Sequence, residues 1–369
     1  MTDNRIAKFA KILVEHSANI QPGDRVAIEA TTAAEPLIRE LVIHILERGG
    51  YPYLLLDLVD GEELLFKYGN EAQLSHVSDV KMFAYKNFES RIRIHSITNT
   101  RSLSNTEATR QKTRQKSFSP ILKVQMKRGA EKAFKWVTTL FPTEAYAMEA
   151  NMGLHEYKDF VFGAVHATQN TSDPIEYWHT MKTKQQKIID YIEGHDQVVL
   201  RGPNVDLKLS IKGRKFNNSY GKHNMPDGEI YTGPVEDSIN GWVKYTYPAI
   251  TQGRVVEGIK LTFKEGKVVS AISRTNQEFL NQMIETDDGS RFVGEFAIGT
   301  NFQIDRFTGN ILFDEKIGGT FHMALGAGYP ETGSRNKSMI HWDMICDLRT
   351  DSEIIVDGEV VYRNGDFIF

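Results

Sequence analysis

The chain has 369 residues, which is long for a single hydrophobic core, so we expect two domains. Its formal net charge of -4 gives no general reason to expect a nucleic-acid partner. A single cysteine, Cys346, excludes an internal disulfide framework and a cysteine-rich zinc site. The first residues carry dispersed charges and no long apolar run, so we expect a cytoplasmic protein without a signal peptide or a membrane span.

The first half of the sequence alternates between strand and helix patterns. Residues 25–29 read as a strand, residues 33–48 as a helix, and residues 53–58 as a buried strand. Such a unit is typical of a largely parallel sheet covered by helices. Ser104 and Glu107 form a capping-box pattern that predicts the start of another helix. We expect further strands at 79–85, 91–97 and 135–140, and helices over 144–192 with an interruption near Asp173 and Pro174.

The composition changes after Gly194. Short alternating runs follow, punctuated by Gly, Pro and Asp, and they predict a mainly antiparallel sheet. The fold class expected is therefore an α/β N-terminal domain, residues 1–195, followed by a mainly antiparallel α+β catalytic and metal-binding domain, residues 196–369.

Five polar residues of the second half stand among apolar neighbours in strand-like segments. They are Glu229 in GEIYTG, Glu295 in GEFAIGTN, His322 in FHMALG, and His341 with Asp343 in IHWDMI. Successive strand residues point to opposite faces, so each polar side chain projects away from the bulky apolar ones. In two of these segments the polar residue shares its face with Ala and Gly, which we interpret as room for a metal ion and a substrate.

Carboxylates and imidazoles of this kind match the ligands of a divalent metal. Five ligands are too many for one tetrahedral catalytic ion with an open position, and they suit two ions that share a bridging carboxylate. Each residue also has an ordinary interpretation, since a lone His is often a hydrogen-bonded core residue and a Glu beside Gly is often a turn residue. The pair His341 and Asp343 is the stronger signal, because two desolvated groups on one face need each other or an ion.

Several common catalytic motifs are absent from the sequence. The Gly-rich stretch 326–333 lacks the GxxxxGK[ST] pattern of a phosphate loop. Neither HExxH nor GxSxG occurs, which sets aside thermolysin-like peptidases and α/β-hydrolases.

Four longer motifs carry a resemblance to a known family. They are NMPDGEIYTGPVEDSINGWV from Asn224, GEFAIGTN from Gly294, FDEKIGGTFHMALGAGYPETG from Phe313 and IHWDMICDLR from Ile340. The sequence strongly resembles the aminopeptidase T and aminopeptidase S family of thermophilic-type metallo-aminopeptidases, and the resemblance extends upstream to QPGDRVAIEA at Gln21.

The resemblance implies a two-domain homodimer whose active sites open into an internal cavity. It implies two divalent ions per chain, with zinc or cobalt as the expected metals and magnesium or manganese as alternatives. The implied ligands are the five residues above together with Tyr329, which spacing alone does not single out. The implied reaction is release of N-terminal residues from short peptides that have a free N-terminus.

The sequence also suggests residues for proton transfer. Glu315 is the best remaining carboxylate for a general base, and Lys316 is a candidate for stabilising an oxyanion. Glu295 is our choice for the bridging carboxylate. Glu236 and Asp237 are candidates for binding the substrate amine, with an equally good interpretation as turn acids.

Two rival functions are kept open. The first retains the metals in a deacylase or amidohydrolase that acts on small amide metabolites and needs no free α-amine. The second is a nucleic-acid- or peptide-binding protein that uses the basic stretch from Arg101 to Lys135. We interpret that stretch as a solvated helical surface, because aromatic residues are sparse in it, and we expect neither a nucleic-acid nor a membrane partner.

Overall fold

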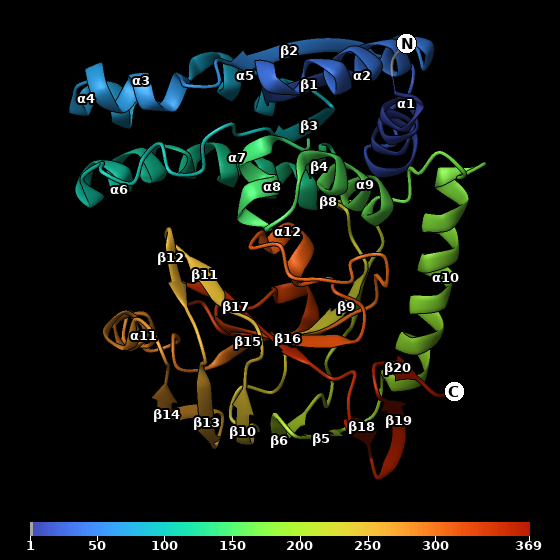
Figure 1. Cartoon of the computed structure of the whole chain (residues 1–369), viewed down its shortest axis with the longest axis vertical. Coiled ribbons are helices and arrows are strands. Elements are labelled where there is room, and N and C mark those ends of the chain that lie inside the picture. The colour runs from blue at the N-terminus through green and yellow to red at the C-terminus, as the bar shows by residue number, and fades with distance from the viewer. Residues whose placement is uncertain (1–2) are drawn as a thin grey trace. The chain divides into compact units, whose positions relative to one another are not determined.

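The computed structural model describes residues 3–369, which form two compact units (Figure 1). The first unit comprises the residues up to Trp178 together with Gly221–Pro226, and the second comprises His179–Tyr220 and Asp227–Phe369. The chain therefore first passes between the units within helix α10 (Pro174–Ile192). A domain boundary near residue 195, just beyond the end of this helix, stays a prediction.

The first unit contains a parallel five-stranded sheet with the strand order β2-β1-β3-β4-β8. Helices connect β1 to β2, β2 to β3 and β3 to β4, as the strand–helix–strand pattern predicts, whereas the chain between β4 and β8 also includes strands β5, β6 and β7 of the second unit. The strands are β1 (Arg25–Thr31), β2 (Tyr51–Asp57), β3 (Ser90–His95), β4 (Lys135–Leu140) and β8 (Asn224–Met225). The helices are α1 (Asn4–Lys11), which continues as a π-helix over Ile12–Ser17, α2 (Glu35–Glu47), α3 (Gly61–Tyr68), α4 (Glu71–Ser75), α5 (Asp79–Asn87), α6 (Ala108–Ser117), α7 (Ser119–Ala130), α8 (Glu144–Glu149) and α9 (Leu154–Ala164).

Three local predictions in this unit were wrong. Residues 79–85 form helix α5 and not a strand, because Ser78 caps the helix by accepting from the backbone N–H of Lys81. Strand β2 is an edge strand and is mostly exposed, so its run of leucines does not mark a buried strand. Helix α6 starts only at Ala108, and its N-cap residue Glu107 makes no side-chain cap.

The second unit consists mainly of antiparallel sheets, as predicted. An eight-stranded sheet has the order β14-β13-β10-β6-β5-β18-β19-β20, a five-stranded sheet has the order β17-β16-β15-β9-β7, and β11 pairs with β12. The strands are β5 (Gln197–Gly202), β6 (Val205–Ser210), β7 (Asn217–Ser219), β9 (Glu229–Thr232), β10 (Asn240–Lys244), β11 (Ala249–Thr251), β12 (Arg254–Val256), β13 (Lys260–Lys264), β14 (Lys267–Ile272), β15 (Val293–Gly299), β16 (Thr320–Gly326), β17 (His341–Asp347), β18 (Glu353–Val356), β19 (Glu359–Arg363) and β20 (Asp366–Phe367). The helices are α11 (Gln277–Ile284), α12 (Ile311–Asp314) and a single 3-10 turn, η3 (Pro330–Thr332).

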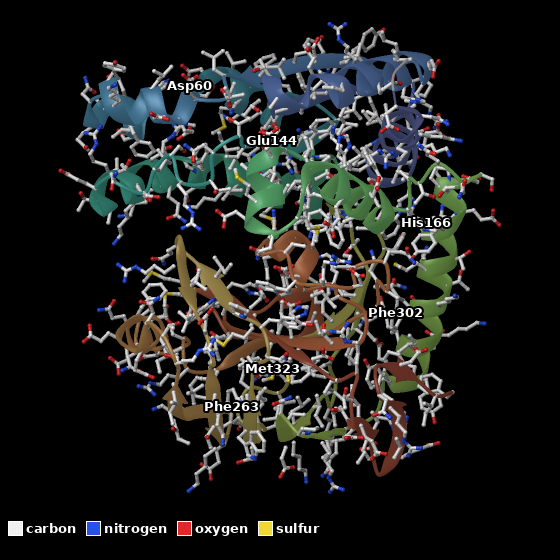
Figure 2. All side chains as sticks on the ribbon, in the orientation of Figure 1. Asp60, Glu144, His166, Phe263, Phe302 and Met323 are labelled. Atoms are coloured by element: carbon white, nitrogen blue, oxygen red, sulfur yellow. The ribbon has the colours of Figure 1, made fainter. Side chains whose placement is uncertain are left out.

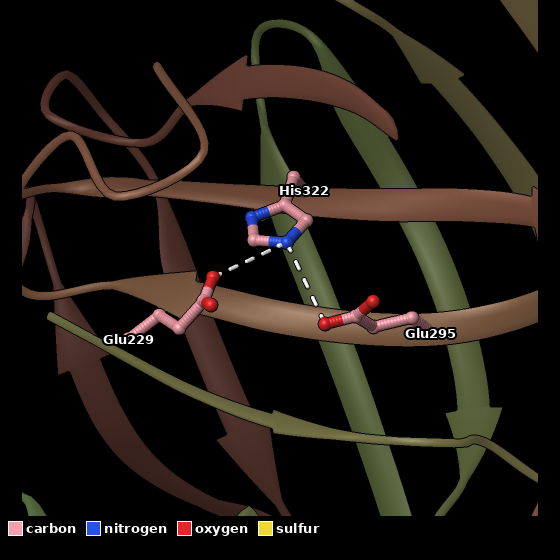
Figure 3. A group of neighbouring side chains, drawn as sticks. All are labelled: Glu229, Glu295 and His322. Carbon is pink, nitrogen blue, oxygen red and sulfur yellow. Dashed lines mark ion pairs between the residues drawn. The ribbon is translucent and has the colours of Figure 1, made fainter. Parts of the chain in front are cut away.

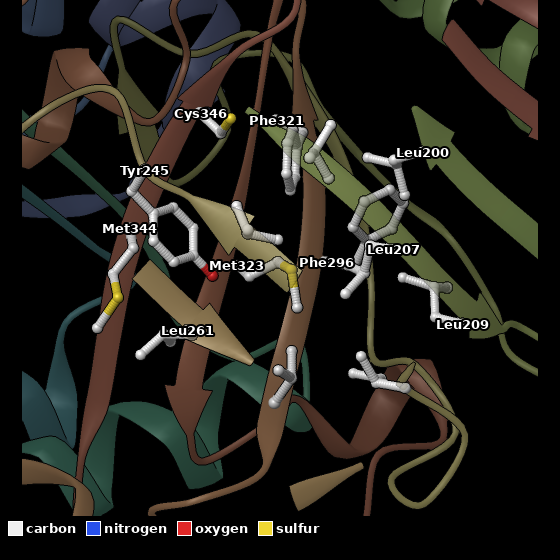
Figure 4. Close-up of a cluster of buried hydrophobic side chains, with 14 of the residues drawn as sticks. Leu200, Leu207, Leu209, Tyr245, Leu261, Phe296, Phe321, Met323, Met344 and Cys346 are labelled. Atoms are coloured by element: carbon white, nitrogen blue, oxygen red, sulfur yellow. The ribbon is translucent and has the colours of Figure 1, made fainter. Parts of the chain in front are cut away.

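One apolar core joins the two large sheets of this unit. Leu200 and Leu207 from the eight-stranded sheet and Phe296 and Phe321 from the five-stranded sheet belong to the same buried cluster (Figure 4). Met323 of β16 lies in this core as well, and its position is labelled among all side chains in Figure 2. Because strand side chains alternate, the other face of the five-stranded sheet is left for the polar residues.

Among the described residues, none of the helices has the length and apolar character needed to span a bilayer.

Candidate metal centre

The register of the five-stranded sheet places all five predicted polar ligands on one face. Glu229 lies opposite Gly299, and Glu295 lies opposite Ala324, which in turn faces Asp343 on β17. His322 pairs with Ala297, two residues from Glu295, and His341 pairs with Gly326. Directly opposed residues in an antiparallel pair share a face, so the predicted same-face arrangement is present in the structure.

Glu295 lies at the centre of this group. One of its carboxylate oxygens is 3.8 Å from His322 Nε2, and the other is 3.2 Å from His341 Nε2. Glu229 Oε2 approaches His322 Nε2 at 3.5 Å from the other side, as Figure 3 shows. Asp343 Oδ1 is 3.5 Å from His341 Nε2. Two ligand clusters therefore meet at Glu295, one with Glu229 and His322 and the other with His341 and Asp343.

The orientation of His341 suits a metal ligand. Its Nδ1 donates to the backbone carbonyl of Ala327 at 2.8 Å, which leaves Nε2 to face the two carboxylates. A backbone acceptor on the second ring nitrogen is the usual way in which a ligating histidine is fixed in one tautomer. Tyr329 lies close by, with its ring centroid 5.6 Å from that of His341.

Glu315 and Lys316, predicted from the sequence as catalytic groups, lie beside the same cluster. They follow helix α12, and the backbone N–H of Asn301 donates to the Lys316 carbonyl at 3.1 Å, which anchors this segment next to β15. The Lys316 side chain is fully buried, contacts the Glu315 carboxylate and has its Nζ 3.6 Å from Glu229 Oε1. A Glu315 oxygen also lies within 4.8 Å of ligand atoms of His322 and Asp343.

Burial and mutual charge shift the pKa values of these groups strongly. Burial raises the pKa of Glu229 to about 8, against the opposing effect of Lys316. Burial would lower the pKa of His322, but Glu295 and Glu229 outweigh it and raise that pKa to about 9. For Lys316, burial is likewise outweighed by Glu229 and Glu315, so its pKa lies above the usual range and the ammonium stays charged.

The donor set fits a divalent cation. Buried polar atoms are normally hydrogen-bonded, yet within the described chain Glu229 Oε2, Asp343 Oδ1 and both ring nitrogens of His322 make no hydrogen bond. Three of these atoms belong to the clusters around Glu295: Glu229 Oε2 lies 3.5 Å from His322 Nε2, and Asp343 Oδ1 lies 3.5 Å from His341 Nε2. A cation bound there would satisfy them together. Carboxylate oxygens with imidazole nitrogens are ligands that zinc and similar ions accept.

The glycines of this face have a different role from the one expected. A Cβ at Gly299 would lie 2.2 Å from the Ile317 carbonyl oxygen, and one at Gly326 would lie 2.2 Å from the Ile340 carbonyl oxygen. Gly326 also has a φ of +101°, which other residues rarely adopt. Close approach of backbone, and not room for a ligand, therefore requires glycine at these two positions.

Sequence reasoning missed two residues here and misplaced one. Tyr231 shares the metal-binding face, since it is two residues after Glu229 and opposite Ala297, and its ring centroid is 5.1 Å from that of Tyr329. The alternation rule that selected Glu229 would have found Tyr231.

Arg214, which no pattern indicated, binds Glu236 through Nη2 and Oε2 at 2.6 Å. Glu236 is thereby engaged in a structural ion pair and is not available as the partner of a substrate amine.

An antiparallel sheet that gathers three carboxylates and two imidazoles on one face, with buried atoms of Glu229, His322 and Asp343 unsatisfied, fits a metal-dependent protein. The comparison with known families names the class more closely. The profile of the family described as Thermophilic metalloprotease (M29) matches residues 2–367. The chain belongs to this family and is a metallopeptidase, so the family resemblance stated from the motifs is confirmed.

Two aminopeptidases are similar in sequence to this chain over almost its whole length. Aminopeptidase 2 of Geobacillus stearothermophilus is 26% identical, over 100% of this chain and 98% of that protein. Aminopeptidase AmpS of Bacillus subtilis (strain 168) is 24% identical, over 99% of this chain and 98% of that protein. The solved structure of wild-type AmpT from Thermus thermophilus has a TM-score of 0.87 at 19% identity and covers 99% of both chains, which shows the same fold.

Proposed function

We propose that this protein is a metal-dependent aminopeptidase that releases N-terminal amino acids from short peptides. The observation that carries the proposal is the pair of ligand clusters that share Glu295, since a shared carboxylate is what a two-metal hydrolytic site needs. The names of the relatives support the choice of an aminopeptidase over the alternative, a deacylase or amidohydrolase of small amides.

The residues that would hold the two ions are Glu229, Glu295, His322, Tyr329, His341 and Asp343, with Glu295 as the bridge. Two divalent ions, when bound, supply a water of lowered pKa and polarise the scissile carbonyl. The two imidazoles favour zinc or cobalt over magnesium or manganese, which prefer oxygen ligands.

Glu315 is proposed as the general base. Burial raises its pKa, so its carboxylate is more basic than that of an ordinary glutamate and takes up a proton more readily near neutral pH. The proton then passes to the leaving amine, which needs it for the amide bond to break. Lys316, permanently charged and fully buried, stabilises negative charge that develops on the substrate carbonyl oxygen.

A hydrolysis panel tests the proposal. Chelator-stripped protein is assayed with aminoacyl anilides and with N-acetyl amino acids, and each divalent metal is added back in turn. We expect cleavage of the anilides alone, restored best by zinc or cobalt. Cleavage of the N-acetyl compounds without cleavage of the anilides would establish the deacylase instead.

Elemental analysis tests the ligand assignment separately. We expect up to two ions per wild-type chain and fewer in His341→Ala. A full complement in that variant would exclude His341 as a ligand.

Three finer expectations stay predictions: a homodimer, a cytoplasmic location, and a division at residues 1–195 and 196–369. Light scattering after size-exclusion chromatography tests the first, cell fractionation the second, and limited proteolysis the third.

A further inference from the structure

A cavity of about 250 Å³ adjoins the candidate metal centre within the second unit. Asp343, one of the proposed ligands, forms part of its wall. Another part comes from helix α12, whose last residue, Asp314, directly precedes the proposed base Glu315. The cavity therefore lies between the metal-binding strands and the segment that carries the proposed proton-transfer groups.

The wall of this cavity is mainly apolar. It is formed by the side chains of Pro248, Ala249, Ile250, Phe307, Ile311 and Ile345. Ile250 on β11 is 40% exposed and Ile311 on α12 is 46% exposed, so these two wall residues are accessible from solvent. An apolar side chain that enters it is removed from water on several sides, which stabilises its binding.

The second acidic group in the wall, Asp314, is already engaged. Its Oδ1 accepts from the backbone N–H of Thr308 at 2.7 Å and from the Thr308 hydroxyl at 2.8 Å. Burial raises the pKa of Asp314 to about 7 against these hydrogen bonds. The carboxyl group thus fixes Thr308 in the loop that precedes helix α12, and it is a poor partner for a cationic ligand.

The wall is also fixed in position. The ring of Phe307 stacks on that of Tyr247 with their centroids 5.5 Å apart. The Tyr247 hydroxyl accepts from Arg349 Nη2 at 2.7 Å, and Arg349 pairs with Asp347 at the end of β17, the strand that carries Asp343. The apolar wall and the metal-binding strand are therefore connected, so the cavity keeps its position relative to the reacting groups.

We infer that this cavity receives the side chain of the substrate's N-terminal residue and selects medium-sized apolar side chains such as those of leucine and methionine. The inference rests on the proposed aminopeptidase function. The volume supports it, because cavities that hold whole drug-sized ligands measure about 300–1,000 Å³, whereas this one suits a single side chain.

The test compares substrate preference in matched variants of the full-length, metal-loaded enzyme. Ile250 and Val255 face each other across the β11–β12 hairpin and are similarly exposed, at 40% and 37%, but only Ile250 lines the cavity. The substrates are leucyl, alanyl and arginyl anilides, and the quantity measured is kcat/KM.

In wild type we expect leucyl to exceed alanyl by about tenfold or more. Ile250→Ala and Ile311→Ala each lower the leucyl-to-alanyl ratio by about threefold, less than a fully enclosed contact would give, because both residues are partly exposed. Ile250→Asp raises the arginyl-to-leucyl ratio of kcat/KM by about tenfold, because the new carboxylate attracts the guanidinium group. The control variants Val255→Ala and Val255→Asp leave the wild-type ratios unchanged.

Unchanged ratios in both alanine variants, or arginyl as the best wild-type substrate, would overturn the assignment of the cavity while the aminopeptidase function stands. Wild-type enzyme that hydrolyses none of the three anilides would refute the proposed function, and the cavity assignment would fall with it.

Discussion

The ion pair between Arg214 and Glu236 is expected to hold the loop that carries Tyr329. The Arg214 side chain is 8% exposed, pairs with Glu236 at 2.6 Å and donates to the backbone carbonyl of Gly333. The other Glu236 oxygen accepts from the backbone N–H of Arg335 at 2.6 Å. Replacing Arg214 by Met removes its hydrogen bond to Gly333 and leaves Glu236, which still accepts from the Arg335 N–H, without its cation.

The size of the effect follows from burial. Removing one partner of a buried ion pair costs about 3–5 kcal/mol. The Glu236 side chain is 24% exposed, so water compensates in part, and we expect a loss of about 2–3 kcal/mol. For a unit of this size, each kcal/mol lowers Tm by about 2–4 °C, which gives a drop of about 4–12 °C. Looser positioning of Tyr329 should also lower kcat/KM.

Calorimetry of Arg214→Met, Glu236→Gln and the double variant measures the coupling between the two residues. We expect the double variant to lose little more stability than Arg214→Met alone, because the two side chains act as a pair. Arg274→Met is the control, since its pair with Glu257 is exposed and worth at most about 1 kcal/mol. The reasoning is refuted if Arg214→Met loses no more stability than Arg274→Met. It is also refuted if the stability losses of Arg214→Met and Glu236→Gln add up in the double variant.

Three further predictions concern the base, the metals and pH. Glu315→Gln should bind metal normally but turn over at least about 100-fold more slowly in the anilide assay, and normal kinetics would remove Glu315 from the mechanism. Addition of a divalent ion to stripped protein at about 100 times its Kd should stabilise the fold by about 2.7 kcal/mol in thermal unfolding, and an unchanged Tm would contradict the site. Burial would raise the pKa of Glu29, but Arg93 and Arg91 outweigh it and lower that pKa below 4.5. The ionised form therefore stabilises the fold fully above pH 4.5 and loses this effect as pH falls through the lower folded pKa. The difference in unfolding free energy between wild type and Glu29→Gln, measured in urea, should be constant near neutrality and shrink in acid; a pH-independent difference would exclude this linkage.

Local patterns predicted the parts of the structure that depend on periodicity. Alternation in the segments around Glu295, His322 and Asp343 correctly placed these side chains opposite the apolar core. It failed at residues 79–85, where a run of mixed apolar residues fits a helix as well as a strand and the cap at Ser78 decides for helix. It also failed for β2, because exposure depends on which strand lies at the sheet edge and not on the strand's own residues.

The sequence by itself determined the chemical types of the candidate ligands, the face on which each one lies within its strand, and the family. Only the tertiary structure decided which of them meet. Strand register brings Glu229 to His322 and places Glu295 between two histidines, and register is set by pairing between segments that are far apart in the chain. The contact of Lys316 with Glu229 and the cavity beside Asp343 arise likewise from long-range packing, which no local pattern encodes.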